Sequence, residues 1–215
     1  MSAEGSLRMA RAVGPNYPAL VGAFEFQFTS MCGPTSGSVV LNAIKSPHVP
    51  TCAQALRAVN QFSILERIGK GRDQVLGQRP SWCEGMVPVM SRGVQLGQLN
   101  QAMRTFGLES TMRTADPTAR TDELRGALIR AVTTPGRYVI VNFDRASLEQ
   151  PGRGHMSPLG AYDKQTDSVL MMDVNSNYNF YWIPVDALIG AMRTRDANQW
   201  RGFLEISPLG SNSSP

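Results

Sequence analysis

The hydrophobic positions of the chain follow two different periods, which change at about residue 135. Before that point apolar residues recur every three to four positions, the spacing of one buried helix face. After it they form short apolar or alternating runs between turn residues, which is typical of β-strands. The first period predicts helices over 32–44, 51–68, 95–106 and 122–134. The second predicts strands over 137–143, 158–163, 168–174, 178–183 and 203–206, with a helix over 185–193 between the last two.

These elements predict an α+β fold in one domain. We expect a helical lobe over about 22–134, packed on a sheet lobe over about 135–206. The strands are closely spaced and joined by short turns, so the sheet should be antiparallel. Residues 1–20, punctuated by Gly and Pro, should cover the surface, and the polar tail 207–215 should be disordered.

The segment before the first helix places a cysteine at a junction. Alternating phenylalanines predict a strand over 22–28, and Cys32 then falls in the first turn of the following helix. Free N–H groups and the positive end of the helix dipole favour the thiolate form of a cysteine there. Pro34 fits this placement, because a proline in the first turn loses no hydrogen bond. The alternative is a buried structural cysteine that only packs.

Composition excludes several classes of function. The net charge is +4 and the sequence pI is about 9.2, but the basic residues are scattered and form no stripe, which argues against nucleic-acid binding. Three cysteines without a CxxC pair, and only two histidines, argue against a disulfide framework and a zinc site. The chain shows neither a signal peptide nor a membrane span, so we expect a cytoplasmic protein, or a periplasmic one if a leader was removed.

A cysteine nucleophile needs a base and a group that orients the base. His48 lies in a polar loop between prolines and is interpreted as an exposed histidine, whereas His155 enters a strand after a Gly-rich turn. Asp173 follows 18 residues later, where two neighbouring antiparallel strands would bring the side chains together. We expect the carboxylate to accept the Nδ1 proton and leave Nε2 facing sulfur. In the alternative, His155 makes a turn hydrogen bond and Asp173 caps a strand.

Several spaced motifs resemble the catalytic domain of phytochelatin synthase, a papain-like cysteine peptidase relative that acts on glutathione. Cys32-Gly33 opens a helix that ends in LNAI at 41–44, GHMSPLGAY occupies 154–162, and MDV occupies 172–174. Arg145 stands ten residues before the histidine, as an arginine does in the family. The resemblance covers roughly residues 22–193. It implies a papain-like fold, with Cys32 as nucleophile, His155 as acid and base and Asp173 as its orienting group.

The resemblance also implies groups that contact the substrate. The family carries a glutamine six residues before the cysteine, which helps to form the oxyanion hole, and a glutamate four before it. Here Gln27 stands five residues before Cys32, and a one-residue deletion in the loop would still let it donate, unless it is a surface glutamine. The glutamate has no counterpart. We expect substrate contacts from Gly154, Ser157 and Arg145, whose planar fork suits a carboxylate unless it is a surface arginine.

The function implied is cysteine-dependent acyl transfer on glutathione or a related small thiol peptide. A thioester at Cys32 would form and be resolved mainly by water, giving γ-Glu-Cys and glycine, as in the short bacterial members that this chain resembles. No cofactor is required, with cadmium or zinc entering as thiolate complexes of the substrate. We expect no nucleic-acid or membrane partner, and an oligomer such as a homodimer stays open. The rival hypotheses are a biosynthetic acyltransferase with another donor, and a noncatalytic binding module.

Overall fold

The computed structural model describes residues 2–45, 60–61, 63–64, 68 and 93–210. The helix expected over 51–68 lies mostly outside these residues. His48, Cys52, Cys83 and the connection at 69–80 lie entirely outside them.

A six-stranded antiparallel sheet organises the described part of the chain, with strand order β1-β8-β2-β3-β4-β5. Its central strands β2 and β3 pair over a long register, from Val139 opposite Leu159 to Asp144 opposite Gly154. A separate two-stranded hairpin, β6 with β7, precedes β8. The strand bounds are β1 Leu108–Thr114, β2 Tyr138–Asp144, β3 Gly154–Asp163, β4 Ser168–Met171, β5 Tyr181–Pro184, β6 Arg195–Asp196, β7 Gln199–Trp200 and β8 Gly202–Pro208.

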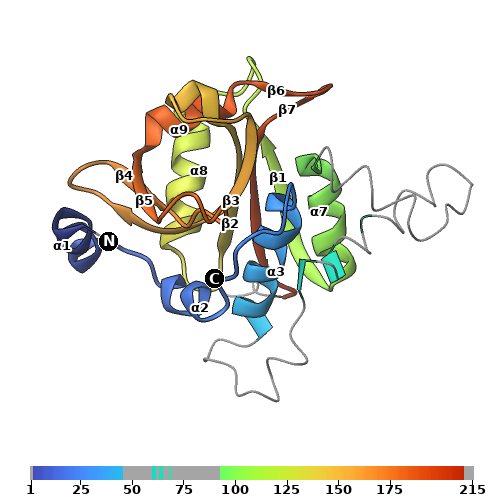
Figure 1. The fold of residues 1–215 in the computed structure, drawn as a ribbon, viewed down its shortest axis with the longest axis horizontal. Coiled ribbons are helices and arrows are strands. Elements are labelled where there is room, and N and C mark those ends of the chain that lie inside the picture. Colours follow the sequence, from blue (N-terminus) through green and yellow to red (C-terminus); the bar gives the residue numbers. More distant parts are fainter. Residues whose placement is uncertain (1, 46–59, 62, 65–67, 69–92, 211–215) are drawn as a thin grey trace, which may run out of the picture.

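Helices cover both faces of this sheet, so its central strands are buried on both sides (Figure 1). Along β2 the side chains alternate: Ile140 packs in the cluster of α3 and α7, whereas Val139 and Val141 pack in the cluster of α8 and α9. The helices are α1 Ala3–Arg11, α2 Tyr17–Gly22, α3 Cys32–Lys45, α7 Leu96–Thr105, α8 Thr121–Thr133 and α9 Val185–Met192, with a 3-10 turn at Arg145–Leu148. The predicted α+β class, with helices packed on an antiparallel sheet, is confirmed.

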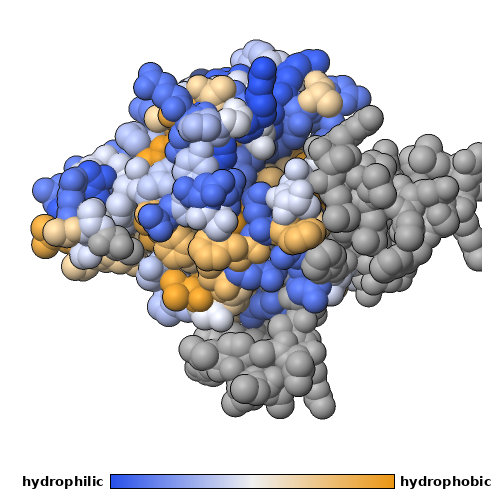
Figure 2. All heavy atoms as spheres, in the orientation of Figure 1, coloured by the Kyte–Doolittle hydropathy of each residue, from blue (hydrophilic) through white to orange (hydrophobic). Residues whose placement is uncertain are grey.

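The strand predicted over 22–28 is wrong. That segment is irregular, and its Gln27 N–H donates to the carbonyl of Val174, 2.8 Å away. Phe26 and Phe28 are 53% and 55% exposed, and apolar side chains gather on this face of the molecule in the region of α2 and the start of α3 (Figure 2). The alternation therefore did not mark a buried sheet face.

Other boundaries also differ from the expectation. Residues 108–114, assigned to the helical lobe, form β1, an edge strand whose mostly polar sequence gave no apolar alternation. Strand β8 runs to Pro208, so the tail does not become irregular at 207. The segment that was expected only to cover the surface contains α1 and most of α2, which ends at Gly22. Ser2 caps α1, and Pro18 stands in the first turn of α2.

Candidate active site

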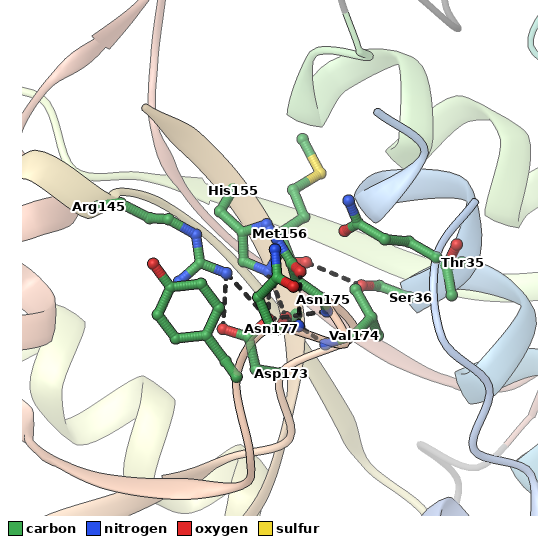
Figure 3. Close-up of polar contacts among 12 residues, drawn as sticks. Thr35, Ser36, Arg145, His155, Met156, Asp173, Val174, Asn175 and Asn177 are labelled. Carbon is green, nitrogen blue, oxygen red and sulfur yellow. Dashed lines mark hydrogen bonds and ion pairs between the residues drawn. The ribbon is translucent and has the colours of Figure 1, made fainter. Parts of the chain in front are cut away.

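Cys32 is the first residue of α3, as predicted, and the packing of the helix start explains its position. A Cβ at Gly33 would lie 2.4 Å from Val94 and 3.1 Å from the sulfur of Met156 in β3, so glycine lets the helix start pack this closely against both residues. The Ser36 hydroxyl donates to the Met156 carbonyl at 3.2 Å (Figure 3). The start of α3 is thereby fixed against the strand that carries His155.

The environment of Cys32 favours a thiolate. The side chain is partly buried, and burial by itself raises the pKa of the thiol. The hydrogen bond and the charge of His155, together with backbone hydrogen bonds at Met156 and Gly33, oppose burial and hold the pKa of Cys32 below its usual value. The geometry thus supplies both a partner that accepts the proton and donors that stabilise the anion.

His155 lies between Cys32 and Asp173, and it is buried. Its Nε2 is 2.9 Å from Oδ1 of Asp173 and 2.9 Å from the Ser157 hydroxyl. The expected assignment of the two ring nitrogens is therefore wrong: Nε2 faces the carboxylate, which leaves Nδ1 for the thiol. Burial lowers the pKa of His155, but the hydrogen bonds to Asp173 and Cys32 raise it overall, which favours the imidazolium.

Asp173 lies in an irregular segment two residues after the end of β4. The strand ends at Met171 and not at 174 as predicted. The side chain is fully buried. Its Oδ1 also accepts the Asn175 N–H at 2.9 Å, an Asx turn that holds the carboxylate toward β3 (Figure 3). Burial raises the pKa of Asp173, whereas the His155 hydrogen bond and the charges of His155 and Arg145 lower it overall. The carboxylate therefore stays ionised next to the imidazole.

A cleft of about 380 Å³ opens at this group, and Cys32, His155 and Gln27 all line it. The Gln27 Nε2 donates to the Thr29 carbonyl at 2.6 Å, while its buried Oε1 has no hydrogen-bond partner among the described residues. Thr29 adopts a left-handed backbone with φ of 46°, a strained conformation for a β-branched residue. The structure thus brings Gln27 to the cleft, with its amide tied to the loop that leads to the cysteine.

The residues expected to contact substrate divide into two groups. Gly154 lines the cleft, and a substrate contact there stays a prediction. Ser157 does not fit it, since its side chain is fully buried, where its hydroxyl lies beside His155 and accepts the Val174 N–H at 3.2 Å. Arg145 reaches the cleft wall but is only 3% exposed, and its guanidinium donates to Asp173 and Gln150.

Sequence reasoning missed further charged residues that line the cleft. Arg201, which is buried, donates from Nη1 to Asn142 at 2.8 Å and from Nε to Thr194 at 3.0 Å. The same Nη1 is 3.4 Å from the carboxylate of Asp196, which also lines the cleft. Arg153 lines it too, and its exposed guanidinium has no hydrogen-bond or ion-pair partner among the residues described. Arg153 is far in sequence from Asp196 and Arg201, so hydrophobic periodicity could not reveal that the three residues line one cleft.

A family profile described as phytochelatin synthase matches residues 1–203. Glutathione gamma-glutamylcysteinyltransferase 3 of Lotus japonicus is 31% identical over 131 residues, which are 59% of this chain and 27% of the plant protein. Glutathione gamma-glutamylcysteinyltransferase 1 of Arabidopsis thaliana is 26% identical over 215 residues, 96% of this chain and 41% of that protein. The chain therefore spans less than half the length of either relative.

Among solved structures, a C39-like peptidase from Bacillus anthracis aligns with 14% identity and a TM-score of 0.49, covering 91% of this chain and 96% of that one. The peptidase domain of Streptococcus ComA aligns with 11% identity and a TM-score of 0.45, covering 86% and 96%. Within the described ranges, no helix combines the length and the apolar character that a membrane crossing requires. These ranges also hold no cluster of three or more His, Cys, Asp or Glu side chains suited to a metal ion.

Proposed function

Because the chain belongs to the phytochelatin synthase family, we propose that it catalyses cysteine-dependent acyl transfer on glutathione or a related small thiol peptide. The observation that carries this proposal is the arrangement of three side chains: Cys32 at a helix start and His155 beside it line one cleft, and the carboxylate of Asp173 is buried behind His155. The names of the relatives supply the donor, since each is a glutathione gamma-glutamylcysteinyltransferase.

The chemistry proceeds in two steps. The Cys32 thiolate attacks the carbonyl of the Cys–Gly amide, and the C–N bond breaks as His155 gives its Nδ1 proton to the departing glycine nitrogen. This leaves a γ-glutamylcysteinyl thioester on Cys32 and a neutral imidazole. His155 then takes a proton from the incoming water or amine, which attacks the thioester and releases the thiolate. Backbone N–H groups at the start of α3 and the amide of Gln27 are the candidate donors to the oxyanion.

The cleft suits a small zwitterionic peptide. Its volume lies near the lower end of the range of roughly 300–1,000 Å³ for small-molecule sites, which fits a tripeptide-sized substrate. The γ-glutamyl end of glutathione carries a carboxylate and an ammonium on one carbon. Arg201 and Asp196 offer one cation and one anion side by side on the wall, and Gly154 lies directly against the guanidinium. We assign the γ-glutamyl end to this pair.

We further propose that water, and not a second peptide, mainly resolves the thioester. Water is present at roughly 55 M, so an amine at millimolar concentration competes only if a dedicated site orients it. The family's glutamate, four residues before the cysteine, has no counterpart here, since Phe28 occupies that position. Glu25 is the nearest acidic residue before Cys32, and it does not line the cleft. Its carboxyl contacts the Ser38 hydroxyl instead, and burial raises its pKa. The expected products are γ-Glu-Cys and glycine.

The test is incubation of the purified protein with glutathione, with and without cadmium, followed by mass spectrometry. A γ-Glu-Cys adduct on Cys32 and release of glycine are expected, and Cys32→Ser should abolish both while keeping the fold. More (γ-Glu-Cys)₂-Gly than γ-Glu-Cys would overturn the hydrolytic reading. No adduct and no product would overturn glutathione as donor and favour an acyltransferase with another substrate.

A further inference from the structure

The guanidinium of Arg145 is buried directly behind the candidate catalytic group. Its Nη2 donates to both oxygens of Asp173, at 2.9 and 2.7 Å (Figure 3), and its Nη1 donates to Oε1 of Gln150 at 2.7 Å. The Tyr178 ring lies against it, with its centroid 4.0 Å from Cζ. Arg145 is 3% exposed and Asp173 is fully buried, so solvent screens this ion pair very little.

Backbone contacts hold Arg145 in this position. It begins the 3-10 turn Arg145–Leu148, where its N–H donates to the Arg153 carbonyl at 3.1 Å and its carbonyl accepts the Gln150 N–H at 3.0 Å. These bonds close the loop between β2 and β3, the strand that carries His155. The backbone bonds fix the Cα of Arg145, and the charge-assisted hydrogen bonds to Asp173 and Gln150 fix its guanidinium.

We propose that Arg145 is a positioning residue that keeps the Asp173 carboxylate ionised and aimed at Nε2 of His155, and that it does not bind a substrate carboxylate. The inference rests on the proposed function, in which His155 and Cys32 perform the acyl transfer. Without the arginine, the buried carboxylate would keep only His155, the Asn175 N–H and the Tyr181 hydroxyl, none of which carries a permanent positive charge. The guanidinium supplies that charge and its Nη2 contacts both oxygens, which opposes protonation and rotation of the carboxylate. Substrate carboxylates are then left to Arg201 and Arg153, which line the same cleft.

The groups facing Asp173 define the expected pH dependence. Among the described residues, Arg145 from the 3-10 turn and His155 from β3 are the charged neighbours, and the Tyr181 hydroxyl from β5 is 3.4 Å from Oδ2. Burial raises the pKa of Tyr181 to about 12, so this tyrosine stays neutral throughout the working range. Because an arginine partner typically lowers an aspartate pKa by about 1–3 units, its removal should let Asp173 protonate at higher pH.

The experiment measures alkylation of Cys32 by iodoacetamide against pH, a readout that needs no substrate. In Arg145→Met we expect the acid limb of the profile to move up by about one pH unit, with a roughly tenfold slower reaction on that limb. Arg145→Lys keeps the positive charge and should restore most of the limb. Arg130→Met, at an exposed arginine of α8 outside the site, is the matched control and should behave as the wild type.

Turnover of glutathione separates the two roles of Arg145. If Arg145 positions Asp173, Arg145→Met should have a lower kcat and a KM within about twofold of the wild type. If Arg145 binds the substrate, the variant should have a raised KM and the acid limb of the alkylation profile should not move. The second result would overturn the proposal. If Arg145→Met fails to fold, a wild-type acid limb together with a raised KM in Arg145→Lys would overturn it equally. Failure of glutathione as a substrate would remove only the turnover arm, because alkylation reports on the protein alone.

Discussion

Replacing Gly154 with alanine should separate substrate recognition from the chemistry of the thiol. A Cβ at this position would lie 2.5 Å from Nη1, 2.8 Å from Nη2 and 3.0 Å from Cζ of Arg201, so the guanidinium of Arg201 would have to move away as a unit. Ordinary contact begins at 3.4 Å, which requires a shift of roughly 0.9 Å. The guanidinium is held at Asn142 and Thr194, at 2.8 and 3.0 Å, and cannot move that far without losing a hydrogen bond.

The magnitude follows from the bonds at risk. A hydrogen bond to a charged group contributes about 1.5–3 kcal/mol, and about 1.4 kcal/mol corresponds to a tenfold change in affinity. If Arg201 binds the substrate, Gly154→Ala should lower kcat/KM for glutathione by roughly 10- to 100-fold, mainly through KM. The rate of Cys32 alkylation should stay within about twofold, since the partners of Cys32 and His155 are retained.

Steady-state kinetics and alkylation of the same preparation provide the assay, with Gly190→Ala as the control. Gly190 lies within α9, where an added Cβ meets nothing within 4 Å, and alanine is favoured over glycine in a helix by about 0.5–1 kcal/mol. That variant should keep wild-type kinetics and melt at the same or a higher temperature. A wild-type KM in Gly154→Ala would refute the role assigned to Arg201.

His155→Ala should slow alkylation of Cys32 near pH 6–7 by at least about tenfold. Without the imidazole, only the backbone hydrogen bonds at Met156 and Gly33 oppose the burial that raises the pKa of Cys32, so the thiolate forms at higher pH; an unchanged profile would contradict the pairing. Ser157→Ala should lower the melting temperature by a few degrees, because a buried backbone N–H loses its acceptor at a cost of about 1–3 kcal/mol. Its KM should stay at the wild-type value, and a KM raised tenfold or more would restore Ser157 as a substrate contact.

The sequence by itself determined the elements whose signals are local. The helix start at Cys32 follows from a proline and apolar residues within one stretch, and the strands of the second half follow from short apolar runs between turns. The spacing of 18 residues suggested the pairing of His155 with Asp173 but left a turn hydrogen bond and a strand cap as alternatives, and the structure shows the pairing. For Cys32, His155 and Asp173 the resemblance and the spacing pointed to the same residues.

Only the tertiary structure decided the features that depend on contacts between distant segments. The structure shows that Nε2 of His155 faces Asp173, which lies beyond the end of β4. It also shows that Arg145, in the loop between β2 and β3, pairs with Asp173. Arg201, which directly precedes β8, reaches the cleft because Gly154 of β3, two strands away in the sheet, leaves room for its guanidinium. Side-chain periodicity reports only how one segment of the chain is buried. These contacts join segments that are distant in sequence and meet only after the sheet has formed, so no local pattern encodes them.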